Sequence, residues 1–578
     1  MKIGGVKMWE FVLSTGWGLW WWEDFAAVSA FRRKVITALV IVLGFLASWF
    51  LIGDLAGSKL GLTDENDLPQ YVGTSGHLEF KDIPRLLIEK TEVGQFGESQ
   101  RFRPVYYIDR LTETALWGLD GGSWYRWRIA MFGMVIAAML WLYTQFAGLA
   151  MGAIVTAYTL SFWMWADIWA RSTGSNEQDA SLGTALFALG AWFFVKRWRN
   201  GTTLLAPSIA AAVGAIIAMG SKENMLLLEV PLGVALLVGL WRRKLGWGST
   251  AALLVAIAFG VWISSSIVVY FLGAKVEDIY GNSLHASVLR SRWMVFVYKG
   301  VVVTAIGAAT IDLLLRRFGD RERLERYRSL AWRNVLYASI IVFVFVFNFL
   351  FYTGRIPAGS RYDFPALLVL PALFILLLKS AGETAGVFGF GVIARKATGL
   401  VLAILLVVHM ARTPWVLPSA AKEAVARNLA FDAGLQEARR MTREHPQWPI
   451  FVESFNYLDY ELVQALGFFF IANSINNPRY LVYVVNPSGE PRDEFQSSLD
   501  QALTSQSTKG VIERGYSPLA DARPPHDGSC FRIVFRKPAQ FAIDQANRID
   551  PIASKQCVDV PLFMYWEGGD LHFDPPNR

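Results

Sequence analysis

Long apolar stretches separated by short polar ones recur along the first 412 residues of the chain. A helix needs about 20 mostly apolar residues to cross the hydrocarbon core of a bilayer. Eleven stretches reach or approach this length, and they lie at 35–52, 129–145, 147–166, 181–196, 204–220, 225–241, 249–273, 296–315, 334–352, 364–379 and 397–412. The pattern therefore predicts a mainly α fold, a polytopic transmembrane helical bundle of about 11 spans.

The pattern changes from residue 414 onward. A helical periodicity at 420–443 is followed by the strand-like runs WPIFVES, RYLVYVV and CFRIVFRK, which Pro, Gly, Ser and Asn clusters separate. We expect a water-facing α/β or α+β domain here. The predicted organisation is a cytoplasmic or interfacial segment at 1–33, a transmembrane domain at 34–413 with a long first outer loop at 53–128, and a soluble domain at 414–578.

Basic residues predict the orientation of the helices. Lys and Arg concentrate in the short cytoplasmic loops of membrane proteins. Here they cluster at every second loop, at 32–34, 196–199, 242–244, 316–333 and 379–396. The N-terminus is therefore expected in the cytoplasm, and an odd number of spans puts the C-terminal domain in the periplasm or its equivalent. The first residues lack the pattern of a cleaved signal peptide, so we expect an integral protein of the inner or plasma membrane.

Composition supports a lipid-embedded protein, since 53% of the residues are hydrophobic and only 18% are charged. The net charge of +7 does not indicate nucleic-acid binding, because the basic residues adjoin apolar runs, where they face membrane lipids. The two cysteines, Cys530 and Cys557, support neither a zinc site nor a redox motif. Pairing between them and two free thiols are both compatible with the sequence.

The first outer loop carries the acidic motif TDENDLP soon after the first span. Its three acids, Asp64, Glu65 and Asp67, can deprotonate an acceptor hydroxyl or hold a divalent cation. The alternative is a solvated loop without chemistry.

The same loop continues with RFRPVYY at 101–107. Arg101 and Arg103 are suited to a phosphate or pyrophosphate group, because guanidinium offers fixed bidentate donors, and Tyr107 adds an aromatic surface for substrate. The alternative is interfacial anchoring by arginines that reach lipid phosphates.

Two further outer loops, SNEQD at 175–179 and SKEN at 221–224, hold ionisable residues beside apolar runs. Glu177 and Asp179 have a functional role, such as contact with substrate, or they belong to a helix N-terminus that favours acidic residues. Lys222 and Glu223 lie between two short apolar runs, where ionisable side chains are costly and indicate function. The alternative for these two is a mutual ion pair that closes a helical hairpin.

A last outer loop, GRIPAGSRYDFP at 354–365, precedes a late span. Arg361 offers a further cationic contact, and Tyr362 offers a ring on which a sugar can stack. Arg292 in the preceding outer loop adds a third substrate contact. The sequence has no phosphate-cradling Gly-rich loop, no serine nucleophile elbow and no zinc-type His pair.

The order of these motifs over residues 30–410 resembles that of the GT-C superfamily. This superfamily comprises polytopic glycosyltransferases that use lipid-linked sugar donors, such as protein O-mannosyltransferases and the lipid A aminoarabinose transferases. The similar features are the acidic loop after the first span, the stretch RFRPVYYIDRLTETALWGLDGGSWYRWRIAMF that leads into the second span, and the later motifs SNEQD, SKEN and Arg361–Tyr362.

The resemblance implies inverting transfer of a sugar from a polyprenyl phosphate to a lipid, glycan or protein acceptor at the outer face of the membrane. It implies Asp64 as catalytic base, with Glu65 in support and Asp67 as a rival, and it implies a donor phosphate held by Arg101, Arg103, Lys222 or Arg361. Some members hold a divalent cation with acids of the first two outer loops, which here points to Glu177 or Asp179 and leaves the metal requirement open. A transporter or flippase of lipid-linked glycans is the alternative, although transporters often contain inverted repeats, which are not seen in this sequence.

Overall fold

The structure, a computed structural model, divides into two compact units that are described separately. The helical unit comprises Met1–Ile52, Ile129–Ile168 and Asn176–Ser419, and the loop unit comprises Gly53–Arg128, Trp169–Ser175 and Ala420–Arg578. The residues that the structure describes are 30–62, 67–98, 101–171, 173–273, 292–352, 356–412, 415–446, 450–454, 466–470, 472–473, 480–484, 517–518, 531–536, 558–559, 563–567 and 570–574.

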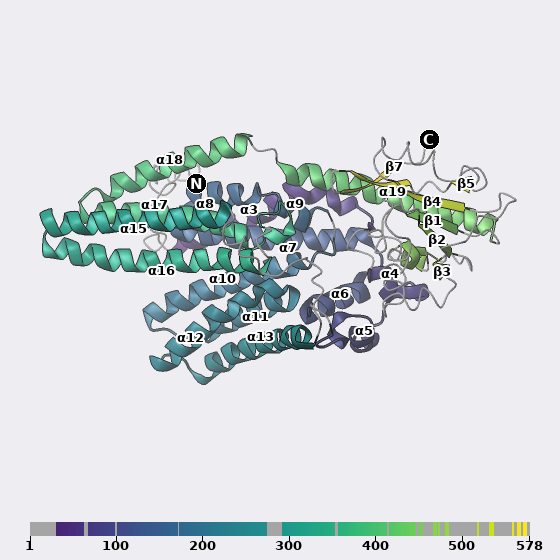
Figure 1. Ribbon diagram of the computed structural model, residues 1–578, viewed down its shortest axis with the longest axis horizontal. Helices are drawn as coiled ribbons and strands as arrows, with labels where there is room; N and C mark the ends of the chain where they lie inside the picture. The colour runs from purple at the N-terminus through teal and green to yellow at the C-terminus, as the bar shows by residue number, and fades with distance from the viewer. Residues whose placement is uncertain are drawn as a thin grey trace, which may run out of the picture. The chain divides into compact units, whose positions relative to one another are not determined.

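Every apolar stretch predicted to span the membrane coincides with a helix (Figure 1). These helices are α3 (Ala30–Ile52), α7 (Gly121–Ala147), α8 (Leu149–Leu160), α10 (Asn176–Asn200), α11 (Leu205–Ser221), α12 (Glu229–Trp241), α13 (Trp247–Gly273), α15 (Arg292–Phe318), α16 (Arg321–Phe351), α17 (Val369–Val387) and α18 (Gly391–Arg412). Seven helical segments of the described chain are long and apolar enough to cross a membrane, and α8 and α11 are shorter apolar helices. The chain is therefore a mainly helical membrane protein, while the full set of 11 spans and their orientation remain predictions.

Several helices begin or end away from the expected boundaries, as α16 does by beginning at Arg321 rather than near 334, and two of them show the cause. α7 begins at Gly121 rather than near 129, so its first two turns precede the apolar stretch and belong to the loop unit. α12 begins at Glu229 rather than near 225, because residues Glu223–Leu228 form a 3₁₀ helix, η5. Both differences arise at the ends of apolar runs, where hydrophobicity does not specify the boundary.

Close packing between α10 and α11 organises the centre of the helical unit. A Cβ added to Gly214 would lie 2.3 Å from the backbone nitrogen of Phe187, and one added to Gly190 would lie 2.4 Å from that of Ala211. Only glycine leaves room for two backbones at this separation, as at many helix contacts in membranes. α10 and α11 are consecutive helices joined by a short loop, so the start of α10 lies near the end of α11.

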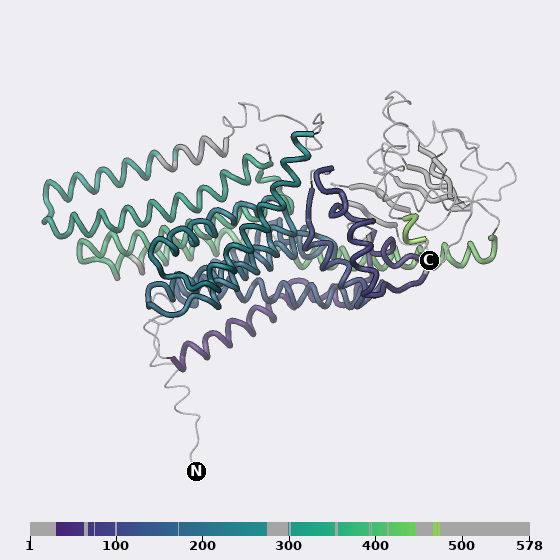
Figure 2. The backbone as a smooth tube through the Cα atoms, turned by 90° about the horizontal axis from the view of Figure 1, so that it is seen from below, coloured from purple at the N-terminus to yellow at the C-terminus, as the bar shows by residue number. Residues whose placement is uncertain are grey.

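The second half of the helical unit contains α15 to α18, and α15 and α16 run side by side as a long hairpin (Figures 1 and 2). α16 packs through Phe345 and Phe349 against Val369 of α17. A hydrogen bond of 2.6 Å from Asn224 Nδ2 in η5 to Asn348 Oδ1 in α16 ties this half to the α11–α12 connection. Both asparagine side chains are fully buried, so this bond fixes how the two helix groups meet.

The loop unit combines the first outer loop with the C-terminal residues. It contains α4 (Asp67–Val72), α5 (Ile83–Glu89), α6 (Pro104–Trp117), the start of α7 and most of α19 (Val416–Glu444). Its described strands are β1 (Ile450–Ser454), β2 (Tyr480–Val484), β3 (Ser517–Pro518), β4 (Phe531–Arg536), β5 (Val558–Asp559), β6 (Phe563–Glu567) and β7 (Asp570–Asp574).

These strands pair in the order β3-β2-β1-β4-β6-β7, and β5 also pairs with β4. β1 pairs in parallel with both β2 and β4, whereas β6 and β7 form an antiparallel pair. The residues between the strands lie largely outside the described chain, as do Cys530 and Cys557. A complete α/β or α+β domain at 414–578 therefore stays a prediction.

Candidate functional site

A buried ionic cluster lies where α10 begins and α11 ends. Lys222 Nζ donates a hydrogen bond to Glu177 Oε1, and the Arg361 Nε lies 3.9 Å from the same carboxylate oxygen. The side chains of Lys222 and Glu177 are only 3% and 2% exposed, and that of Arg361 is 25% exposed. Two cations of distant loops thus converge on one carboxylate inside an apolar helical unit.

The backbone positions each member of this cluster. Glu177 lies in the first turn of α10, where the helix dipole favours an acidic residue. Lys222 follows the last residue of α11 in an extended conformation, so the chain leaves the helix axis there. The glycine contacts between α10 and α11 bring these two helix ends together. The pairing therefore follows from how closely the two helices approach.

The loop that carries Arg361 is held by two carboxylates. Asp363 accepts hydrogen bonds from the backbone N–H groups of Ala358 and Gly359, at 2.6 and 2.8 Å. Asp167 of α9 (Met164–Trp169) accepts one from the N–H of Arg361, also at 2.8 Å. Burial raises the pKa of Asp363, and the amide hydrogen bonds oppose that rise. Both acids thus serve to fix the loop that presents Arg361.

Two tyrosine rings flank the cationic side of the cluster. The Lys222 ammonium lies 5.2 Å from the ring centroid of Tyr362 and 5.8 Å from that of Tyr352. The two rings are themselves 5.6 Å apart. Cation–π attraction of this kind favours the charged form of a lysine inside a poorly hydrated site. The cluster therefore combines positive charge with aromatic faces, which suits a ligand that carries both an anion and a ring.

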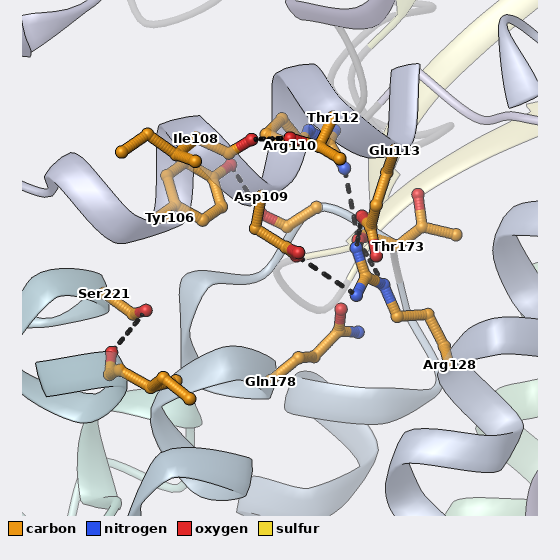
Figure 3. A network of polar contacts seen from close by, with 12 residues as sticks. Tyr106, Ile108, Asp109, Arg110, Thr112, Glu113, Arg128, Thr173, Gln178 and Ser221 are labelled. Atoms are coloured by element: carbon orange, nitrogen blue, oxygen red, sulfur yellow. Dashed lines mark hydrogen bonds and ion pairs between the residues drawn. The ribbon is translucent and has the colours of Figure 1, made fainter. Parts of the chain in front are cut away.

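A second buried cluster lies in the loop unit, between α6, α7 and residues 173–174 (Figure 3). Arg128 donates a hydrogen bond to Glu113, and both Arg128 Nε and Arg110 Nη1 donate to the Thr173 carbonyl at 3.2 Å. The guanidinium carbons of Arg110 and Arg128 lie 5.0 and 5.6 Å from the ring centroid of Trp124. All these residues are at most 3% exposed, so the cluster holds the 173–174 segment against α6 and α7.

The acidic members of this second cluster differ in environment. Burial raises the pKa of Glu113 from 4.5 to about 7, and the Arg128 guanidinium opposes the rise. Asp109 lies 4.0 Å from Arg128 with 39% of its side chain exposed. Burial of Glu113 thus outweighs the attraction of Arg128 in setting the direction of its pKa shift.

Sequence reasoning did not identify Arg110, Glu113 or Arg128. The available signal was the spacing of Arg110 and Glu113, three residues apart on one helical face, beside two tryptophans at 117 and 124. That spacing does not show whether the polar face is buried.

The structure brings together four of the residues predicted from the sequence, namely Glu177, Lys222, Arg361 and Tyr362. Glu223 and Asp179 are buried beside members of this group in the chain, at 7% and 6% exposure. Of the other described candidates, Arg101, Arg103 and Tyr107 belong to the loop unit, Asp67 is the first residue of α4, and Arg292 is the first residue of α15.

Arg103 immediately precedes α6, and the Tyr107 ring packs edge-on against that of Tyr106 at 4.9 Å. Asp64 and Glu65 lie outside the described residues. Among the residues that are described, no group of three His, Cys, Asp or Glu side chains has the arrangement of a metal site. The use of a divalent cation stays a prediction, since the acids of the first outer loop belong to its predicted ligands.

No model of a known protein family matches the sequence, and a search of curated protein sequences finds no match either.

Proposed function

We propose that the protein transfers a sugar from a polyprenyl phosphate to a lipid, glycan or protein acceptor, with inversion at the anomeric carbon. The observation that carries this proposal is the Lys222–Glu177–Arg361 cluster beside two tyrosine rings. Ionisable residues buried among membrane helices are costly and usually serve transport or catalysis. The order of sequence motifs that resembles the GT-C superfamily adds independent support.

The charges of the cluster suit a phosphate ligand. Glu177 carries one negative charge that Lys222 and Arg361 share. A phosphate diester bound between Lys222 and Arg361 would replace Glu177 as their partner. Both cations would then keep charge-assisted hydrogen bonds. When the bond between the sugar and the phosphate breaks, negative charge grows on the phosphate, and two fixed cations stabilise that charge more than they stabilise the ground state.

The remaining chemistry is a single displacement. The acceptor hydroxyl oxygen forms a bond to the anomeric carbon while the bond from that carbon to the phosphate oxygen breaks, and the polyprenyl phosphate leaves. Asp64 takes the hydroxyl proton, with Glu65 in support. This assignment rests on the sequence resemblance, and Asp67 is the alternative base.

The test is sugar transfer by purified protein in nanodiscs, supplied with radiolabelled polyprenyl-phosphate sugars and a panel of membrane-lipid, glycan and peptide acceptors. We expect Asp64→Asn to lower turnover by about 10²–10⁴-fold while donor binding persists, as for loss of a general base. We expect Arg361→Ala to weaken donor binding as well. Glu89→Gln is the matched control, because Glu89 is an exposed acid of the same loop, paired only at the surface with Arg85.

Two results would contradict the proposal. Full transfer by the variants Asp64→Asn and Asp67→Asn would exclude both as the base. Donor binding without product for every acceptor, together with donor movement across a sealed vesicle membrane, would favour the transporter.

A further inference from the structure

An apolar cavity of ≈ 700 Å³ lies inside the helical unit, between α10, α12 and α16. Among its described lining residues only Arg199 and Ser339 are polar, and the others include Phe194, Trp198 and Phe343. A volume of this size is typical of pockets that bind a small molecule. The cavity therefore has the size and lining of a site for a hydrocarbon chain.

The cavity lies toward one end of α10. On this helix its lining runs from Phe187 to Arg199, whereas Glu177 lies at the opposite end. At 1.5 Å per residue, Glu177 and Arg199 are separated along the helix by about 33 Å. The cavity also reaches Leu227 and Leu228 of η5, but its basic end at Arg199 and the ionic cluster are too far apart for one phosphate group to contact both.

The end of α10 nearest the cavity is strongly basic. Six cationic residues lie at the ends of α10 and α12 and in the loop that follows α12, and the sequence has no acidic residue at 180–222 or at 230–273. The Lys244 ammonium lies 5.0 Å from the ring centroid of Trp198, which lines the cavity. The six residues are Lys196, Arg197, Arg199, Arg242, Arg243 and Lys244.

One wall of the cavity is apolar yet exposed. Val230, Val234 and Val238 of α12 are 52%, 55% and 40% exposed. Because the apolar segment Glu223–Trp241, which joins η5 and α12, is long enough to cross a membrane, this face contacts lipid rather than water. A lipid can therefore enter the cavity from the bilayer.

We propose that the cavity binds one anionic phospholipid of the leaflet at the basic end of α10. An acyl chain occupies the space between α10, α12 and α16, and the phosphate lies near Arg199 and Lys244. A cytoplasmic leaflet rich in anionic lipid attracts such a cluster of basic residues. The polyprenyl-phosphate donor is a different ligand, because its phosphate belongs at the opposite end of α10. The site is independent of whether the protein transfers sugars.

The test is native mass spectrometry of the full chain, released from nanodiscs that contain equal amounts of phosphatidylglycerol and phosphatidylcholine with the same acyl chains. We expect one phosphatidylglycerol to remain bound. Val234→Trp fills the cavity wall and should abolish retention, whereas Leu237→Trp alters an exposed residue of the same helix that does not line the cavity.

The charge contribution is tested by Arg199→Gln with Lys244→Gln. Each Lys or Arg near a membrane surface raises the affinity for anionic lipid about fivefold. The double variant should therefore bind phosphatidylglycerol about 25-fold more weakly. Arg317→Gln, an exposed charge at the end of α15, is the control and should leave binding unchanged. Equal retention of the two lipids, equal effects of Val234→Trp and Leu237→Trp, or displacement of the bound lipid by stoichiometric polyprenyl phosphate would overturn the proposal.

Discussion

Replacing Lys222 with methionine tests whether the buried cluster serves function as well as stability. The substitution keeps a similar length and removes the charge, so that Glu177, at 2% exposure, loses the ammonium and keeps Arg361 Nε at 3.9 Å. Breaking a buried ion pair by removing one partner costs about 3–5 kcal/mol, because a charge stays buried without its compensation. We expect a loss of unfolding free energy of that size, measured by reversible SDS unfolding in mixed micelles.

The double variant Lys222→Met with Glu177→Gln separates the two roles. Removing both charges also removes the uncompensated carboxylate, so at least about half of the lost stability should return. Sugar transfer should not return, because the donor phosphate would still lack one of its two cations. A purely structural cluster predicts the opposite, namely that stability and transfer recover together.

The surface pair of Arg321 and Glu325 provides the matched control. Its nitrogen and oxygen are 3.0 Å apart, but the side chains are 92% and 65% exposed. Such pairs contribute about 0–1 kcal/mol, so Arg321→Gln should hardly change the unfolding free energy. If Lys222→Met were no more costly than Arg321→Gln, the reasoning about burial would be refuted.

Three further substitutions test other parts of the structure. Folding raises the pKa of Glu113 from 4.5 to about 7. The contribution of Glu113 to the free energy of unfolding, up to about 3 kcal/mol, is therefore complete below pH 4.5 and is lost as the pH rises through 7. Glu113→Gln should remove this part of the pH dependence of thermal unfolding, and an unchanged profile would contradict the assignment. Gly214→Val should lower the free energy of unfolding by about 1–3 kcal/mol or more, because its Cβ would lie 2.3 Å from Phe187 N. An unfolding free energy in SDS within about 0.5 kcal/mol of wild type would exclude that close contact. Asn224→Leu should cost about 1–3 kcal/mol in the same assay because Asn348 loses its buried donor, and no loss would show that this hydrogen bond is dispensable.

The helices of the membrane region could be predicted from the sequence because a single property decides them. A run of about 20 apolar residues in lipid must satisfy its backbone hydrogen bonds internally, and a helix does this without any partner. Local hydrophobicity therefore suffices to identify the elements, although it does not specify their ends. Residues 121–128 extend α7 beyond its apolar run because Arg128 and Trp124 are buried by contacts that the sequence pattern does not contain.

The partners within the candidate site could not be predicted in the same way. The sequence identified Lys222 and Glu177 separately, as ionisable residues beside apolar runs, and suggested Glu223 as the partner of Lys222. The structure pairs Lys222 with Glu177, 45 positions away. That pairing depends on how closely α10 approaches α11, which is set by glycines whose effect appears only when both helices are in place. Sequence position indicates which residues are unusual, whereas tertiary packing decides what they contact.

α6 shows that polar residues of the first outer loop are buried in a way that the sequence pattern does not indicate. Its polar residues Arg110 and Glu113 are buried at 1% and 3% exposure, whereas Ile108 and Leu116 are 46% and 57% exposed. The buried side of α6 also carries Leu111 and Ala115, at 0% and 4% exposure, so the helix buries polar and apolar residues together. Arg110 donates a hydrogen bond to the Thr173 carbonyl within the loop unit, so the proposed donor phosphate is assigned to other cations. This reasoning favours Lys222 and Arg361 over the arginines of α6 and α7 as the phosphate ligands.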